Sequence, residues 1–199
     1  TGFAAPNALA ISHEDALYVS DSFTGEIRKV APDGTSNTLW VQSDLLVPHG
    51  FPPFGANGVA FDRNQRYLYV ANTADDKILR VPVEEDGSAG AVEVFADGAT
   101  INASQNTTQA LDGADGIAFD VQGNLYVCAN QANEIQVLSP SGKLVKRYAG
   151  TGSNMLVFPA SLVFRGRSLY ITNLSLADGG VNSKLSILKT PLPGAPLRP

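Results

Sequence analysis

Short apolar runs, separated by polar turns, make up almost the whole chain, and four of these runs open in the same way. They are Pro6-Asn7-Ala8-Leu9-Ala10-Ile11, Ala56-Asn57-Gly58-Val59-Ala60-Phe61, Ala114-Asp115-Gly116-Ile117-Ala118-Phe119 and Pro159-Ala160-Ser161-Leu162-Val163-Phe164. A second apolar run follows each of them after a few residues; these second runs are Leu17-Tyr18-Val19, Leu68-Tyr69-Val70, Leu125-Tyr126-Val127 and Leu169-Tyr170-Ile171. The polar residues between the two runs are those of tight turns. The pattern therefore predicts repeated β-hairpins.

Further strands follow each hairpin. Apolar and polar residues alternate in Lys77-Ile78-Leu79-Arg80-Val81 and its counterparts, as expected for a half-exposed third strand. Outer strands are predicted near Ser36–Trp40, Val92–Phe95 and Leu144–Tyr148. No segment shows a convincing helical period, so the chain is predicted to be all-β.

A repeat of about 50 residues that consists only of short strands is typical of a β-propeller. We expect a single propeller domain over residues 1–199, with four blades at approximately 1–48, 49–110, 111–155 and 156–199. The fourth repeat runs into Pro191 and Pro193, which cannot continue a strand ladder, so it lacks an outer strand. Only Thr1–Ala5 precede the first inner strand, too few residues to supply one. We therefore expect an open ring whose upstream blades are absent; a closed four-bladed ring is the alternative.

Composition narrows the classes of function. The chain has 199 residues, a net charge of −5 and scattered charges, which argues against a nucleic-acid partner. No apolar run reaches the roughly 18 residues needed to span a bilayer, so no membrane partner is expected. The single cysteine, Cys128, excludes an intramolecular disulfide. Asn-x-Ser/Thr triplets at Asn102, Asn106 and Asn173 do not decide the compartment; the protein is expected to be soluble, with secreted and periplasmic locations left open.

The candidate chemistry lies at the heads of the inner strands, which a propeller arranges around one axis. These positions hold Asn7, Asn57, Asp115 and Ala160. Hard cations such as Ca²⁺ take carboxylate and amide oxygens as ligands, so Asn57 and Asp115 are candidate metal ligands. The alternative is that Asn57-Gly58 and Asp115-Gly116 are turn residues at loop ends.

The strand heads and the Leu-Tyr-Val strands resemble the senescence-marker-protein/gluconolactonase family of the calcium-dependent phosphotriesterase superfamily. The ending Leu192-Pro193-Gly194-Ala195-Pro196-Leu197 is similar to the last residues of that family. The resemblance implies a six-bladed propeller of which this chain holds the last four blades. It also implies a divalent cation (Ca²⁺, or another such as Zn²⁺ or Mn²⁺) at the top of the central tunnel.

By this resemblance Asn57 and Asp115 are metal ligands, Asn7 contacts substrate or water, and the position of Ala160 contributes no ligand. A Glu ligand from the first blade is missing from the sequence. Family lactonases often carry an Arg two residues before the third-blade Asn, where this chain has Ala5, which puts a sugar-lactone specificity in question.

The function implied is metal-dependent hydrolysis of a small-molecule lactone or related ester. Asp115 is then a candidate general base, and His49, in a loop just before the Asn57 strand, is the second because imidazole titrates near neutral pH. A loop around Phe51 and Phe54 either lines an apolar pocket beside the cation or fills space between blades. A non-catalytic ligand- or protein-binding propeller and a strictosidine-synthase-like propeller are the alternatives. The substrate, the native cation and the oligomeric state are not determined by the sequence.

Overall fold

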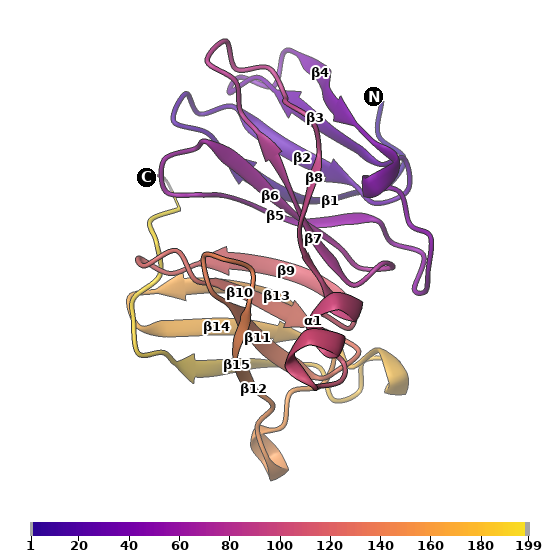
Figure 1. Ribbon diagram of the computed structural model, residues 1–199, viewed down its shortest axis with the longest axis vertical. Coiled ribbons are helices and arrows are strands. Elements are labelled where there is room, and N and C mark those ends of the chain that lie inside the picture. Colours follow the sequence, from indigo (N-terminus) through magenta and orange to yellow (C-terminus); the bar gives the residue numbers. More distant parts are fainter. Residues whose placement is uncertain (1, 198–199) are drawn as a thin grey trace.

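Four antiparallel β-sheets form the framework of the chain in the computed structural model, which describes residues 2–197 (Figure 1). The first sheet holds β1 (Pro6–Ile11), β2 (Leu17–Asp21), β3 (Glu26–Val30) and β4 (Asn37–Gln42). The second holds β5 (Ala56–Phe61), β6 (Tyr67–Asn72), β7 (Lys77–Pro82) and β8 (Glu93–Asp97). The third holds β9 (Ala114–Phe119), β10 (Leu125–Ala129), β11 (Glu134–Leu138) and β12 (Leu144–Tyr148). The fourth holds β13 (Pro159–Arg165), β14 (Ser168–Asn173) and β15 (Lys184–Lys189).

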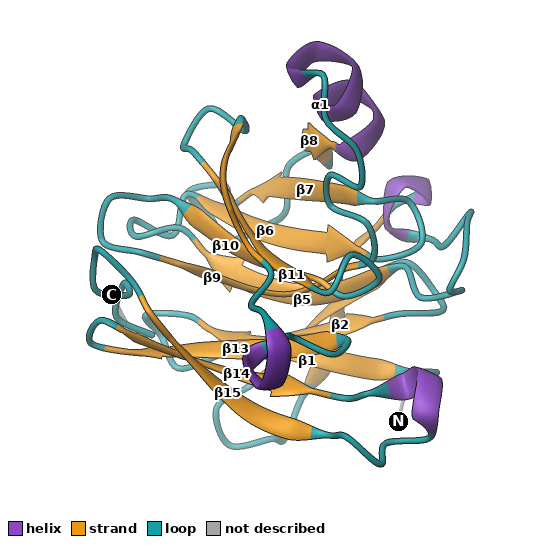
Figure 2. Cartoon of the chain, turned by 90° about the horizontal axis from the view of Figure 1, so that it is seen from below, coloured by secondary structure: helices purple, strands orange, loops and turns teal. Residues whose placement is uncertain are grey.

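The sheets are arranged as the four blades of a β-propeller, which confirms the predicted fold class. Each sheet is a meander in chain order, and the inner strands β1, β5, β9 and β13 pack against one another in that sequence. In Figure 2 these inner strands lie toward the middle of the view, whereas β8 and β15 lie at its periphery. Among residues 2–197, β13 and β1 do not pack in the same close way. The described blades therefore form an open fan.

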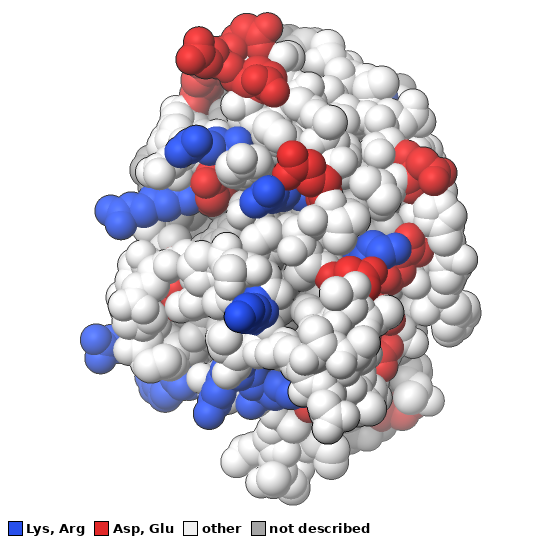
Figure 3. Space-filling view, viewed as in Figure 1, with Lys and Arg blue, Asp and Glu red and all other residues white. Residues whose placement is uncertain are grey.

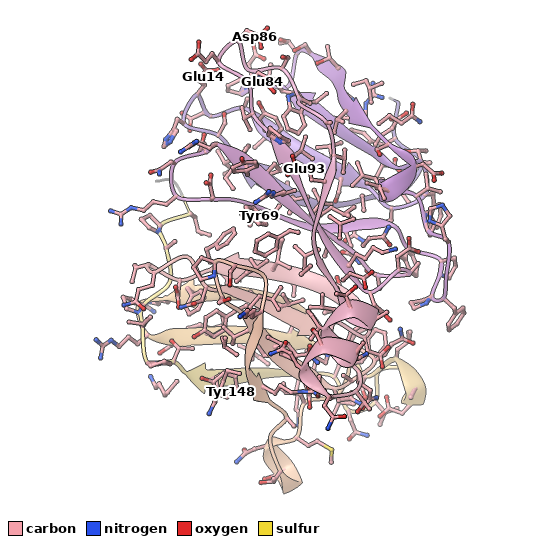
Figure 4. The ribbon with its side chains drawn as sticks, in the orientation of Figure 1. Glu14, Tyr69, Glu84, Asp86, Glu93 and Tyr148 are labelled. Carbon is pink, nitrogen blue, oxygen red and sulfur yellow. The ribbon has the colours of Figure 1, made fainter. Side chains whose placement is uncertain are left out.

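A repeated aromatic contact joins neighbouring blades. In the first three blades the tyrosine of the second strand packs edge-on against a phenylalanine at or next to the end of the following inner strand. The pairs are Tyr18–Phe61 at 5.0 Å, Tyr69–Phe119 at 5.0 Å and Tyr126–Phe164 at 5.1 Å between ring centroids, with interplanar angles of 81–87°. Tyr69, labelled in Figure 4, lies between the second and third sheets. Edge-to-face geometry is favourable for aromatic rings, so these pairs set the angle between blades.

Two details differ from the predicted elements. An α-helix, α1 (Gly98–Gln105), follows β8, where no helix was predicted. Its apolar pattern is weak, with only Gly98 and Ile101 buried, and its first turn is capped by the Asp97 carboxylate, which accepts from the Thr100 N–H. The outer strands β4 and β8 each begin one residue later and end two residues later than expected. No helix in residues 2–197 has the length and apolar character to cross a membrane.

The free face of the fourth sheet is apolar. Val163, Tyr170 and Ile187 lie in register across its three strands, and Val163 and Ile187 are exposed. At the equivalent place in the second blade, Tyr69 is buried by the third blade. This face is exposed because, in the described residues, no further blade packs against the fourth sheet as the third packs against the second.

The C-terminal segment returns to the centre of the molecule. The Ala195 N–H donates to the Phe119 carbonyl at 2.9 Å, and the Gly194 N–H donates to the Gly166 carbonyl at 3.0 Å. This segment therefore runs from the fourth blade to the third, at the end of the inner strands opposite Asp115.

Candidate functional site

A β-bulge lies at the head of every inner strand. In the second blade, Ala56 pairs with Asn72 and Val59 with Val70, so that Asn57 and Gly58 oppose a single residue of β6. The register shifts in the same way at Asn7, at Asp115 and at Ala160. A bulge bends its strand locally and re-aims the side chain that it carries. This is how four separate sheets present the residues at equivalent positions toward one place.

Gly58 and Gly116 allow the bulges of neighbouring blades to touch. A Cβ added to Gly58 would lie 2.2 Å from the Asp115 carbonyl oxygen, and one added to Gly116 would lie 2.7 Å from the Ser161 Cα. Neither glycine has a positive φ, and both lie inside strands. Close backbone approach, and not turn formation, therefore requires glycine after Asn57 and Asp115.

Each polar strand head has a polar partner just after the second strand of its own blade. Asn7 Nδ2 donates to Ser22 Oγ at 2.9 Å, Asn57 Nδ2 donates to Thr73 Oγ1 at 2.9 Å, and Asn130 Nδ2 donates to Asp115 Oδ2 at 3.1 Å. Two of these partners also reach the next blade: Ser22 Oγ donates to the Ala56 carbonyl at 2.9 Å and Thr73 Oγ1 to the Ala114 carbonyl at 2.7 Å. The site is thus held by a chain of hydrogen bonds that crosses from blade to blade.

Sequence reasoning missed these three partners, although a signal was present. Ser22, Thr73 and Asn130 occupy one repeat position, four residues after the recurring tyrosine. In the fourth blade the same position is Leu174, opposite Ala160. Both members of the pair are thus apolar where the strand head was predicted to contribute no ligand.

Asn57 and Asp115 come together. Burial raises the pKa of the Asp115 carboxyl to about 7, while hydrogen bonds from Asn130, Asn57 and the Gly116 N–H favour its charged form. The Asn57 side chain itself is 5% exposed. A carboxylate and an amide from neighbouring blades therefore share one partly enclosed location.

These two residues lie at one end of a central channel of about 440 Å³. Asn7 and Ser161 contribute the other polar side chains of its lining, and aliphatic and aromatic residues of the four inner strands supply most of the rest. Ala195, Pro196 and Leu197 line it as well. None of these lining residues is a lysine, arginine or histidine. The channel is therefore apolar apart from its head.

His49 lies outside this lining. Its Nδ1 is 2.9 Å from Asp75 Oδ2, and its Nε2 is 3.4 Å from Asp44 Oδ1. The hydrogen bond and charge of Asp75, with a smaller contribution from Asp44, raise the pKa of the His49 imidazole. Both ring nitrogens are thus engaged by carboxylates, and the structure does not bring His49 together with Asn7, Asn57 and Asp115.

Acidic side chains lie along the site end of the blades on the face shown in Figure 3, with basic ones among them (right-hand edge). Burial first, and then the charges of Asp112, Asp75 and Asp97, raise the pKa of Asp76 to about 6, although the Gly113 N–H bond to its carboxylate opposes this. In the described residues no group of three or more His, Cys, Asp or Glu side chains is placed to hold a metal ion. Asn57 and Asp115 are oxygen donors, the kind that hard cations take, but they supply two ligands and one charge.

Comparison with known proteins agrees with the geometry. The family model described as the SMP-30/gluconolactonase/LRE-like region matches residues 53–175, more than half of the chain. A search of curated proteins found no match.

Solved structures share the fold. A gluconolactonase from Xanthomonas campestris has 19% identity and a TM-score of 0.65, over 98% of this chain and 59% of that one. Regucalcin from Agrobacterium tumefaciens, described as a calcium-binding protein, has 18% identity and a TM-score of 0.66, over 96% and 62%. Virginiamycin B lyase from Staphylococcus aureus has 15% identity and a TM-score of 0.57, over 94% and 56%. The chain thus spans about three fifths of the length of these proteins. With the propeller, the bulged strand heads and the family match in agreement, the chain belongs to the SMP-30/gluconolactonase/LRE-like family.

Proposed function

We propose that this propeller hydrolyses a small lactone or related ester at the head of its channel, with a divalent cation held by Asn57 and Asp115. The observation that carries the proposal is the contact between these two side chains, from equivalent bulges of neighbouring blades, next to Asn7. The family membership supports the reaction class.

The donor chemistry fits a hard cation. Amide and carboxylate oxygens suit Ca²⁺ first and accommodate Mn²⁺ or Zn²⁺, and the remaining positions would be filled by water and substrate. Because affinity rises with the number of charged ligands, a site with one carboxylate should bind Ca²⁺ weakly, on the order of millimolar. When bound, the cation would polarise the carbonyl oxygen of the ester and stabilise the charge that develops there.

The protein's own residues would orient the reactants and move the proton. Asn7, fixed by Ser22, would position the substrate or the attacking water. We assign proton transfer from that water to Asp115, the carboxylate at the channel head, whose charged form a bound cation would favour. The water oxygen would bond to the carbonyl carbon as its proton passes to Asp115, the ring C–O bond would break, and Asp115 would return the proton to the leaving alkoxide, which gives a hydroxy acid. His49 is the second candidate base, and its contacts with Asp75 and Asp44 count against it.

A calcium titration followed by thermal melting tests the metal site. A ligand that binds only the folded state must raise the melting temperature, so millimolar Ca²⁺ should stabilise the wild-type chain and fail to stabilise Asp115→Asn. Lactone hydrolysis should need the cation and should be lost in Asp115→Asn and retained in His49→Gln. No stabilisation by Ca²⁺, Mn²⁺ or Zn²⁺ together with no hydrolysis would favour the second candidate, a non-catalytic binding propeller. The presence of only two ligands in the described residues is the observation that keeps this second candidate open.

A further inference from the structure

The loops at the site end of the blades are unusually apolar. Large hydrophobic side chains are exposed on them at Phe23, Phe51, Phe54, Met155, Leu174, Leu176 and Val181. The opposite end exposes two in the described residues, Val121 and Leu197. Exposed apolar side chains that lie together on one face often mark a binding surface, whereas single scattered ones need no explanation.

Two of these side chains form a pair. The rings of Phe23 and Phe54 stack with centroids 5.7 Å apart and an interplanar angle of 27°, while remaining 53% and 39% exposed. A backbone hydrogen bond keeps the two rings close: the Gly55 N–H, next to Phe54, donates to the carbonyl of Ser22, next to Phe23, at 2.8 Å.

The pair lies beside the proposed site along the chain, outside the residues that line the channel. Phe23 directly follows Ser22, the partner of Asn7, and Phe54 lies three residues before Asn57. On the other side of the same loop, Gln131 Nε2 donates to the Phe51 carbonyl at 3.4 Å, next to Asn130, the partner of Asp115. The loop that contains Phe51 and Phe54 thus connects the first blade to the second and also contacts the third, next to the partners of Asn7 and Asp115.

Charge restricts what this surface can accept. The site end of the blades is net acidic: its connecting loops carry Asp44, Asp75, Asp76, Asp112 and Asp178, which outnumber Lys77, Arg147 and Lys184, the basic side chains that reach these loops from strands. A surface of this sign repels anionic ligands and anionic membranes. The occupant that fits is neutral and partly apolar.

We propose that Phe23 and Phe54 form a specificity site for the apolar substituent of a neutral substrate, an aryl or alkyl lactone in preference to a polyhydroxylated one. The inference rests on the proposed function, because it assigns the reacting ester group to the adjacent channel head. An apolar group placed against the two rings removes exposed aromatic surface from water, which favours binding. The acidic loops would also repel the carboxylate product.

The test separates binding from turnover. Lactams resist hydrolysis, so binding of 5-phenyl-2-pyrrolidinone and of 2-pyrrolidinone to the whole chain is measured by calorimetry in millimolar CaCl₂. We expect the phenyl compound to bind on the order of ten-fold more tightly. Phe54→Ala should remove this difference, and Val121→Ala, an exposed apolar residue at the opposite end, should keep it. Phe23→Ala is the second variant in case Phe54→Ala unfolds, which circular dichroism would show.

Turnover of γ-phenyl-γ-butyrolactone, γ-butyrolactone and glucono-δ-lactone completes the test. Faster hydrolysis of the phenyl lactone, abolished by Phe54→Ala, supports the inference. Equal binding of the two lactams, no binding of either, or a preference for glucono-δ-lactone overturns it while leaving lactone hydrolysis standing. Discrimination between the lactams without hydrolysis of any lactone would instead refute the proposed reaction and retain the aromatic site.

Discussion

Thr73 accepts a hydrogen bond from Asn57 at 2.9 Å and donates one to the Ala114 carbonyl at 2.7 Å, immediately before Asp115. One buried hydroxyl therefore connects the two strand heads that form the proposed metal site. The relationship makes the site a property of two blades together and not of either alone.

Replacing Thr73 by valine should loosen this connection. The substitution keeps the shape but removes the hydroxyl that bonds both the Asn57 amide and the Ala114 carbonyl, at a cost of about 1–3 kcal/mol in the free energy of unfolding. Stabilisation by Ca²⁺ should fall as well, which denaturant melts with and without the cation would measure. Thr73→Ser should restore both properties, and Thr38→Val, whose hydroxyl is exposed on β4, should change neither. Equal behaviour of the two valine variants would contradict the proposed connection.

The pKa of Asp115 predicts how stability depends on pH without metal. The folded-state value of about 7 lies above the ordinary 3.8, so between about pH 4 and pH 7 the folded chain holds a proton that the unfolded chain has lost. The free energy of unfolding should therefore fall as pH rises through this window. Asp115→Asn should lose this part of the pH dependence and exceed the wild type in stability at about pH 8 in EDTA.

Asp76 provides the control for this measurement. Its pKa is also raised, to about 6, so it also lowers the free energy of unfolding as pH rises, but only between about pH 4 and pH 6. Asp76→Asn should thus reduce the slope between about pH 4 and pH 6, where both groups contribute, and leave the fall in stability between about pH 6 and pH 7 in place. If Asp115→Asn and the wild type have parallel profiles, the carboxyl of residue 115 is not held in the environment described.

Gly113 makes room for the Asn130 side chain. A Cβ at Gly113, where φ is +69°, would lie 2.0 Å from Asn130 Oδ1, and Asn130 Nδ2 donates to Asp115. Gly113→Ala should therefore displace Asn130, disturb Asp115 and reduce stabilisation by Ca²⁺, in addition to backbone strain of about 1–2 kcal/mol. Gly34→Ala is the matched control, since Gly34 has a φ of +71° and no heavy atom within 4 Å of the added Cβ. It should show the strain alone in denaturant melts, with the calcium response unchanged.

The periodic features of the chain were predictable, and the local ones were not. The recurring strand heads and tyrosines predict blades because every repeat must bury the same positions. α1 lacked a sequence signal because its residues bury little and a single Asp97 cap begins it. The strand heads were identified from the sequence, but their bulges were not. A bulge is an extra residue in one strand relative to its partner, so it depends on how the two strands pair and not on either strand alone. The role of His49 stays a prediction: its loop precedes the Asn57 strand, and its ring contacts Asp75 and Asp44 and is not among the residues that line the channel.

The aromatic contacts between blades should be measurable as pairwise coupling. Tyr69 packs edge-on against Phe119 at 5.0 Å, and both side chains lie in the core shared by the second and third blades. In a double-mutant cycle with Tyr69→Leu and Phe119→Leu, we expect a coupling energy of about 0.5–1.5 kcal/mol in the free energy of unfolding, beyond the area each ring buries. Phe51, which is 80% exposed, supplies the control, and a cycle of Tyr69→Leu with Phe51→Leu should show additivity. Additive behaviour of Tyr69 and Phe119 would mean that blade spacing depends on aliphatic burial alone, and that the recurring tyrosine acts only as a large apolar residue.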